Sequence, residues 1–452
     1  MKKILVSVAA ATMALSTTAS ALEDIKVSGQ AKLWYETQNA EKRGSVTSSD
    51  RSLFDKDDAA GEVVFKLGMT GKQGDVGFGA TVYQGSTMGL DGNVVSAVRT
   101  NANELGGKSG NGDMFVGELY ITAPVAPDTV LKFGKQELDT PLAFTERWNA
   151  MPNTFNAAVA INSSIENVTL IAAYIGQGNA GSTSFTVSAA NAGTTSKYVN
   201  GGFQAGDTFT NYYGGAYALA ALYKQDALTA NVWAYYINDA IKSTVPALTD
   251  KVDAYALWLD AATKMGDANV KGYLAYMDHT ASSKLADTLA KTVDGVNGDA
   301  TFAAALSADM KVSDITLFGA ASYVSEGDLP VANTATGYKK TMLPTQGIYT
   351  DGLYVAQPGS TAVKVSAATK LGDTALSLNA VHNMNSGEKG QKMGIVGTNA
   401  EALETTEVYA TVKQKLGAFD LMGIVMHRMM DDDATDDAQG GQYVRVVASV
   451  NF

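Results

Sequence analysis

Residues 442–452 read Gln-Tyr-Val-Arg-Val-Val-Ala-Ser-Val-Asn-Phe, a stretch in which apolar and polar side chains alternate. One face collects Val444, Val446, Ala448, Val450 and Phe452, and the other collects Tyr443, Arg445, Ser449 and Asn451. A period of two residues is the pattern of a β-strand whose two faces meet different surroundings. The stretch therefore predicts a sheet with one apolar face.

The same alternation recurs along the chain in stretches of roughly ten residues bounded by turn signals. It predicts eighteen strands, at 25–35, 60–71, 76–86, 114–123, 130–136, 157–164, 168–176, 212–223, 228–238, 253–263, 269–279, 299–311, 315–325, 362–371, 374–384, 404–415, 418–430 and 442–452. Sixteen strands also fit, because boundaries drawn from one sequence shift by a few residues. An even number places both ends of the sheet on one side, so the last strand can pair with the first and leave no open edge.

Short and long junctions alternate between these strands. The short ones are rich in Gly and Asp, as at 72–75, 265–267 and 372–373, which favours tight turns. The long ones, at 87–113, 177–211, 326–361 and 431–441, lack periodicity and predict solvent-exposed loops. This is the layout of a transmembrane β-barrel with tight turns at one end and long loops at the other.

The first residues predict export. Lys2 and Lys3 precede a mostly apolar run, Ile4 to Leu15, which is too short to span a bilayer as a helix. Ala19-Ser20-Ala21 has the small residues of a cleavage site, so we expect a signal peptide at 1–21 and a single barrel domain at 22–452. A mean hydropathy of −0.03 suits a barrel with an apolar outside and a polar inside. The chain has no cysteine, which excludes disulfides and thiolate metal sites.

If the apolar face of each strand meets lipid, the opposite face lines the lumen. This parity directs a set of basic side chains inward: Lys26, Lys32, Lys66, Lys132, Lys364, Lys370, Lys413 and Arg445. Their strands lie near the two ends of the sequence, which closure makes neighbours. The pattern predicts a basic wall in the lumen; the alternative is that these lysines extend to the interface. Aromatic residues near strand ends predict interfacial girdles, namely Trp34, Tyr35, Tyr120, Tyr174, Tyr236 and Tyr323.

The segment after the fifth predicted strand differs from the other long junctions. It contains Pro141 and Pro152, which an interior strand would not tolerate. It carries acidic residues, and it also has bulky apolar anchors: Leu138, Phe144, Trp148, Met151 and Phe155. Such a composition predicts a loop packed inside another structure.

The run Gly-Lys-Gln-Glu-Leu-Asp-Thr-Pro-Leu at 134–142, followed by Arg-Trp at 147–148 and Met-Pro-Asn-Thr-Phe at 151–155, resembles the constriction loop of OprD-type and campylobacterial major outer membrane porins. The terminal Phe452 is similar to the residue that the barrel-assembly machinery reads in bacterial outer-membrane barrels. The resemblance implies a third loop folded into the lumen and a channel for ions and small hydrophilic solutes. It also implies an outer-membrane location among lipid and lipopolysaccharide and a homotrimer, although monomers occur. No nucleic-acid partner is expected.

Selection by such a channel depends on charge and diameter at its narrowest point. We expect Glu137, Asp139, Glu146 and Arg147 to line this constriction opposite the basic wall, setting up a transverse field. Without Lys2 and Lys3, the remaining 32 basic and 46 acidic residues give a net charge of −14, which predicts weak cation selectivity. The basic wall argues for the opposite sign.

Other functions have less support. A barrel adhesin or structural surface protein with a blocked lumen remains the alternative, because the long loops could bind a partner. The three histidines, His279, His382 and His427, lie on strands that are not adjacent, so no catalytic centre is expected and the chain is predicted not to be an enzyme. The acidic run at 431–437 has ligands that calcium prefers but lacks the pattern of an EF-hand loop. No cofactor is expected, although bound Ca²⁺ is compatible with this run.

The absence of cysteine allows a direct test of the inward loop. A single cysteine placed within 135–156 should be shielded from bulky thiol reagents added outside the cell, because the loop lies within the barrel. Rapid labelling of the 135–156 position in intact cells would place the segment outside.

Overall fold

The computed structural model describes residues 22–39, 52–54, 56, 59–91, 114–147, 150–180, 185–187, 205–243, 251–280, 299–336, 340–348, 352, 354–386, 403–432 and 439–452. The predicted signal peptide and most of the acidic run lie outside these residues. No helix in the described part of the chain is long and apolar enough to cross a membrane.

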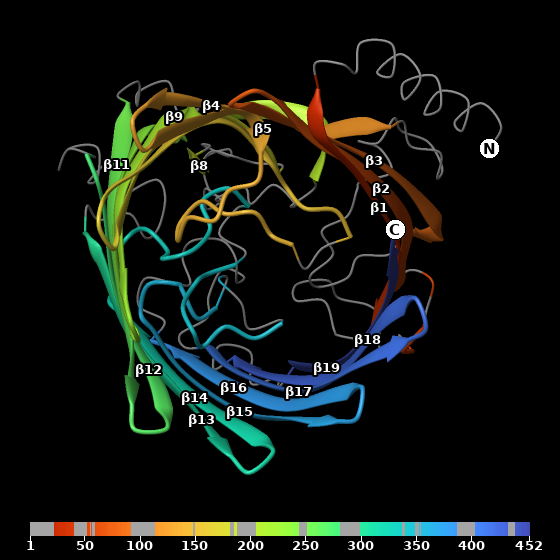
Figure 1. Cartoon of the computed structure of the whole chain (residues 1–452). Helices are drawn as coiled ribbons and strands as arrows, with labels where there is room; N and C mark the ends of the chain where they lie inside the picture. The colour runs from red at the N-terminus through yellow and green to blue at the C-terminus, as the bar shows by residue number, and fades with distance from the viewer. Residues whose placement is uncertain are drawn as a thin grey trace.

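In the described part of the chain, nineteen strands form one sheet. They are β1 (Glu23–Gln38), β2 (Ala59–Gln73), β3 (Val76–Asp91), β4 (Phe115–Ala126), β5 (Thr129–Gln136), β6 (Phe155–Ile165), β7 (Val168–Ala180), β8 (Phe185–Val187), β9 (Ala205–Gln225), β10 (Leu228–Ser243), β11 (Val252–Met265), β12 (Ala268–His279), β13 (Thr301–Val312), β14 (Ile315–Val324), β15 (Ser360–Leu371), β16 (Thr374–Asn385), β17 (Leu403–Leu416), β18 (Phe419–Asp432) and β19 (Gln439–Asn451). All except the short β8, which pairs in parallel with β10, form an antiparallel ring (Figure 1). The predicted eighteen-stranded barrel is confirmed.

The ring closes where β1 pairs with β19, from Gln30 opposite Asn451 to Gln38 opposite Tyr443. The last residue extends this pairing, because Phe452 N donates to Gly29 O over 3.0 Å and Gly29 N donates to Phe452 O over 2.7 Å. The Phe452 ring covers Gly29, where an added Cβ would lie 2.1 Å from the ring. Glycine is therefore needed at position 29 to let the terminal ring lie on the strand.

Side chains alternate between the two surfaces of the ring. In β19 the inward Tyr443 and Arg445 are buried, whereas the outward Val446 is 43% exposed. The outward face also carries a row of tyrosines, Tyr174, Tyr217, Tyr236 and Tyr255, whose neighbouring rings have centroids 5.1–6.2 Å apart. The predicted parity of the strands is thus present, and these tyrosines suit an interfacial girdle.

Two of the aromatic residues predicted for the girdles lie elsewhere. Trp34 is buried on the inward face, where its indole N–H donates to Glu36 Oε1 over 2.5 Å. Tyr120 also faces inward, with Lys132 Nζ 3.8 Å from its ring centroid. Both residues share the strand parity of inward lysines, so alternation places them in the lumen despite their aromatic character.

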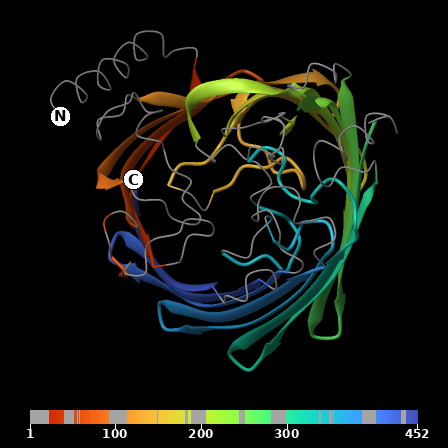
Figure 2. The same ribbon diagram turned by 180° about the vertical axis from the view of Figure 1, so that it is seen from behind.

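Two segments fold into the ring, and Figures 1 and 2 show both inside it from opposite sides. The first inward segment is the described part of 137–154, between β5 and β6, as predicted for the third loop. The second inward segment is the described part of 325–359, between β14 and β15. The prediction that 326–361 forms a solvent-exposed loop is wrong, because residues such as Leu329, Val331 and Val355 are at most 2% exposed.

Gly29→Val tests the role of the terminal ring in closing the barrel. The new side chain should displace Phe452 and lower the free energy of unfolding by about 1 kcal/mol, the value of a cross-strand aromatic contact. Urea unfolding of protein refolded into lipid vesicles measures the change. Gly423→Val is the matched control, because a Cβ at that outward position of β18 meets nothing within 4 Å. An equal effect of both substitutions would contradict a specific role for the Gly29–Phe452 contact.

Candidate functional site

The first inward segment leaves the wall at a glycine. Gly134 has a φ of +120°, and an added Cβ there would lie 2.2 Å from Leu119 O. A larger residue would push β5 away from β4 just before the chain turns into the lumen. Gly134 therefore fixes the point from which the segment departs.

An arginine holds two acidic residues of this segment together. Arg147 Nε donates to Glu137 Oε2 over 2.7 Å, and its two terminal nitrogens donate to the oxygens of Asp139 over 2.5 and 3.0 Å. The hydrogen bonds to Asp139 and then to Glu137 raise the pKa of the Arg147 guanidinium further above its ordinary value. Asp139 and Arg147 keep 69% and 49% of their side chains exposed, so this charged cluster faces open space.

The far end of the segment reaches the neighbouring part of the wall, around the closure of the ring. Lys32 Nζ on β1 donates to Ala150 O over 3.3 Å. Met151 is fully buried in a cluster with Trp34, Val64 and other residues of β1, β2, β3 and β19. The segment thus crosses from β5 and β6 to the closure region of the barrel and divides the lumen.

The wall of β2–β5 faces the Arg147 cluster across the remaining space. Lys66 lies 5.5 Å from the Tyr83 ring centroid, and Lys132 lies 3.8 Å from that of Tyr120. Glu137 interacts electrostatically with Tyr83, Tyr120 and Lys132, which places the cluster close to this wall. Glu118, on the same wall, also interacts with these groups.

We refer to the space between the wall residues and the Arg147 cluster as the aperture. Its bordering side chains are Lys32, Lys66, Glu118, Tyr120, Lys132, Glu137, Asp139 and Arg147, while the Tyr83 ring is buried behind Lys66. Four basic and three acidic side chains thus border it, together with the Tyr120 ring. Such a border can sort solutes by charge and diameter without covalent chemistry.

Glu146, predicted to line the constriction, is placed differently. Its side chain is fully buried, and its Oε1 accepts hydrogen bonds from Asn333 Nδ2 over 3.1 Å and from Thr336 Oγ1 over 2.5 Å. Asn333 and Thr336 belong to the second inward segment, which was not expected in the lumen. The carboxylate of Glu146 therefore joins the two segments and does not border the aperture.

Backbone contacts strengthen the junction of the two inward segments. Asn333 Oδ1 accepts a hydrogen bond from Phe144 N over 3.1 Å, and Asn333 Nδ2 donates to Phe144 O over 3.0 Å. Thr334 N donates to Leu142 O over 2.8 Å. Tyr213 on β9 donates to Thr334 O over 2.9 Å, which ties the junction to the wall.

The second inward segment is also held by the wall of β15–β17. Lys364 Nζ on β15 donates to Gln346 O over 2.7 Å, and Ile348 N donates to Glu407 Oε1 on β17 over 2.6 Å. Lys364 was predicted as part of a basic wall open to the lumen. In the structure its ammonium anchors a loop.

The other members of the predicted basic wall occupy three settings. Lys32, Lys66 and Lys132 border the aperture. Arg445 is buried and pairs with Glu36 over 2.9 Å. Lys26, Lys370 and Lys413 are exposed near the tight-turn ends of their strands, away from the lysines at the aperture. Arg445 is thus compensated locally, and the effect of the remaining charges on permeation stays a prediction.

Several site residues were missed at the sequence level, among them Tyr83, Glu118 and Asn333. Strand parity held a signal for the first two, because both lie on inward faces, where Tyr83 is paired with Lys66 and Glu118 with Thr81. Asn333 had no such signal, since its partners lie nearly two hundred residues earlier in the chain. Among described residues no group of three or more His, Cys, Asp or Glu could hold a metal ion.

The histidines lie in separate settings. His279 is buried against Asp328, with Nε2 2.9 Å from Oδ2, and His382 Nδ1 lies 2.8 Å from Thr406 Oγ1. The buried pair joins the end of β12 to the second inward segment. His427 lies on the outward face of β18.

No family model and no curated relative matches the chain. Solved structures do match over nearly their whole length. Pseudomonas aeruginosa OccK8 (OprE) is 14% identical with a TM-score of 0.64, covering 95% of this chain and 98% of that chain. Acinetobacter baumannii OccAB1 is 12% identical with a TM-score of 0.66, covering 95% and 97%. A BenF-like porin from Pseudomonas fluorescens is 11% identical with a TM-score of 0.62, covering 96% and 100%.

These identities are low, so the similarity shows the fold. The eighteen-stranded ring is the fold of these outer-membrane channels, and the resemblance of the chain to OprD-type porins is confirmed at the level of the fold. The solved structures with this fold are channels and not enzymes.

Asn333→Ala tests the junction of the inward segments. It removes the hydrogen bonds to Phe144 and Glu146, and we expect local opening to become easier by about 2 kcal/mol, or about thirtyfold in the opening equilibrium. Amide hydrogen exchange at Phe144 and Thr145 measures it. Asn238→Ala, which removes one exposed hydrogen bond to Gly214 O, is the control. Unchanged exchange in Asn333→Ala would show that the junction does not hold the first segment.

Proposed function

We propose that this chain is an outer-membrane porin whose lumen passes ions and small hydrophilic solutes by passive diffusion. The observation that carries the proposal is the closed ring, which has apolar side chains outside and a charged aperture inside. A barrel of about 16–18 strands is wide enough to leave an aqueous channel. The inward segments reduce this width, so passage is set at the aperture.

The outward face supports a membrane location. Large apolar side chains are exposed around the ring, including Leu119, Leu219, Leu306 and Val365, each at least 58% exposed. Such a surface is stable in hydrocarbon and would be costly in water. A closed antiparallel ring also leaves no unpaired strand edge to lipid. We therefore place the chain in the bacterial outer membrane.

We infer that the charges bordering the aperture decide the sign of selectivity. The described border holds Lys32, Lys66, Lys132 and Arg147 against Glu118, Glu137 and Asp139. Charges farther away are screened within about 8 Å at physiological salt, so the net charge of the chain counts for less. The net charge of the chain predicted weak cation selectivity, and that prediction is untested. The charges at the aperture, four basic against three acidic, instead favour weak selectivity for small anions.

Two solved structures with the same fold suggest test solutes. One holds vanillate in Pseudomonas aeruginosa OpdK, and one holds glucuronate in OccK2 (OpdF) of the same organism. Both are small organic anions, which fits a border of lysines and arginine interrupted by carboxylates. We propose small organic anions of this kind as the first solutes to assay.

The partners expected from the sequence remain proposals. We expect a homotrimer, contact with lipopolysaccharide and recognition of Phe452 by the barrel-assembly machinery. Residues 433–438 lie outside the described part, so the suggested Ca²⁺ at the acidic run is still a proposal as well. Cross-linking in native membranes measures the oligomeric state directly.

The second candidate function is an adhesin or structural surface barrel with a closed lumen. The observation that favours it is the burial of two loops inside the ring, with Glu146, Asn333 and Val331 at 0% exposure. Such packing could fill the lumen instead of narrowing it. Single-channel recording decides between the two, because a closed barrel would be silent.

Neutralising the wall lysines tests the selectivity. Wild-type protein in a planar bilayer should conduct in steady steps, with a reversal potential under a KCl gradient that favours chloride. Lys66→Gln together with Lys132→Gln should shift the reversal potential towards cations, because the carboxylates then dominate the border. Lys224→Gln, at an exposed position near a tight turn, is the control and should leave the potential unchanged.

The outcomes separate the proposals. Silence from a folded barrel would overturn the porin and support the closed lumen. Conductance that favours K⁺ in the wild type would support the sign expected from net charge. Equal shifts in the double variant and in Lys224→Gln would show that the aperture does not control selectivity.

A further inference from the structure

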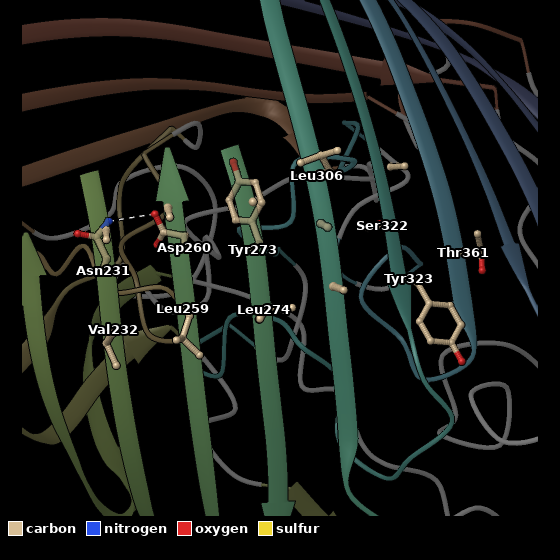
Figure 3. A pocket seen from close by; sticks show the side chains of 16 residues that line it. Asn231, Val232, Leu259, Asp260, Tyr273, Leu274, Leu306, Ser322, Tyr323 and Thr361 are labelled. Carbon is tan, nitrogen blue, oxygen red and sulfur yellow. Dashed lines mark hydrogen bonds between the residues drawn. The ribbon is translucent and has the colours of Figure 1, made fainter. Parts of the chain in front are cut away.

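A hollow of about 750 Å³ lies across β10–β15. Most of the residues that line it point their side chains outward, away from the lumen. Val232, Leu259, Leu274 and Tyr323 among them are 40–51% exposed. Figure 3 shows Val232, Leu259 and Leu274 on three successive strands, with Tyr323 and Thr361 farther along the sheet. The hollow therefore belongs to the surface that faces lipid and is separate from the aperture.

The strand register makes this hollow a straight groove. One row of directly paired residues follows the order Val232, Leu259, Leu274, Ala304, Tyr323 and Thr361. The adjacent row is Ala230, Ala261, Gly272, Leu306 and Ala321. Four of the five residues in the second row are Ala or Gly, so they form a low floor beside larger side chains. Six strands spaced about 4.8 Å apart give the groove a length of roughly 24 Å.

The groove runs obliquely through the membrane. Rows of paired residues run perpendicular to antiparallel strands, and barrel strands tilt by roughly 40°. Val232 is the fifth residue of β10, several residues above its tight-turn end, whereas Thr361 is the second residue of β15 at its long-loop end. A row of about 24 Å at this tilt rises roughly 15 Å, which is more than half of an apolar band of about 25 Å. The groove thus spans about one leaflet, on the long-loop side.

The chemistry of the groove differs between its ends. Ala, Gly, Val and Leu form most of it, and outward hydroxyls occur only where Tyr323 and Thr361 lie, at the long-loop end. Asn231 and Asp260 also border the hollow, but their side chains are on the inward face and bond to each other over 2.9 Å. A ligand that fits is a hydrocarbon chain whose polar end lies at the membrane surface.

We propose that this groove binds one acyl chain of a membrane lipid from the leaflet on the long-loop side. A hydrocarbon chain is narrow and flexible enough to follow an oblique groove between two rows of side chains. A second copy of the barrel is a poorer fit. Two convex outer surfaces touch only along a narrow line, so the second barrel would leave the groove unfilled. The binding is independent of the channel, and conductance does not report on it.

Photo-cross-linking tests the site. The full chain is refolded into vesicles of dimyristoylphosphatidylcholine that contain a phosphatidylethanolamine with a diazirine midway along one acyl chain. Peptide mapping after irradiation locates the cross-links. Adducts should concentrate on Leu274, Ala304 and Leu306, compared with outward positions elsewhere on the ring such as Leu119 and Val425. Even labelling around the ring would overturn the proposal, since it would show only the bulk lipid that surrounds any barrel.

A groove-filling variant adds a second measurement. A Cβ at Gly272 meets nothing within 4 Å, so Gly272→Leu places its side chain in the groove without a clash. It should reduce adducts at the neighbouring groove residues several-fold. Gly319→Leu is the matched control, because Gly319 is also outward and open but does not line the hollow. It should leave the adducts unchanged.

Each remaining outcome decides the question. Equal losses in both variants, or no loss in Gly272→Leu, would overturn a specific acyl-chain site. Protection of the whole groove from the lipid probe, together with protein–protein cross-links through the same strands, would assign the groove to a second copy and also overturn the proposal. If a variant fails to refold, the distribution of cross-links on the wild-type protein still tests the proposal by itself.

Discussion

Backbone hydrogen bonding is the constraint on which this structure depends. A sheet in hydrocarbon has no water to pair with an open edge, so the first and last strands must join. The pairing of β1 with β19 meets this requirement, and the chain end at Phe452 continues it by exchanging two hydrogen bonds with Gly29. Closure then fixes which face of every strand is inside. The lumen, the lipid surface and the outward groove all follow from it.

The interior shows how a wide ring can hold two folded segments. Where they pack, many inward positions of the wall are alanine, including Ala218, Ala256 and Ala303. These side chains leave room for apolar residues such as Leu142 and Val331 from the two segments. Hydrogen bonds through Asn333 and Glu146 then satisfy polar groups that this packing buries. The apolar contacts bury surface area and so stabilise the packing. The hydrogen bonds fix how the two segments lie against each other.

Charge inside the barrel is arranged by local pairs. Arg445 meets Glu36, Lys271 meets Asp260, and Arg147 meets two carboxylates. In most of these pairs the opposite charges cancel each other within a few ångströms. The acidic excess of the whole chain therefore says little about the electric field at the aperture. The side chains that border the aperture act at short range in a narrow space, where their effect on a passing ion is greatest.

The sequence by itself determined where the strands lie and which face of each is apolar, because alternation is a local property of residues two apart. It favoured eighteen strands but left sixteen open. It also identified 137–154 as an inward segment, through prolines and bulky residues that suit neither a strand nor an exposed loop. The prediction of girdle positions for Trp34 and Tyr120 was wrong, because it weighed their aromatic character above the strand parity that places both inside. Only the tertiary structure decided that 325–359 also folds inward and that Glu146 is buried. Those outcomes depend on contacts such as Asn333 with Phe144, between residues far apart in the chain, and no local pattern encodes such a contact.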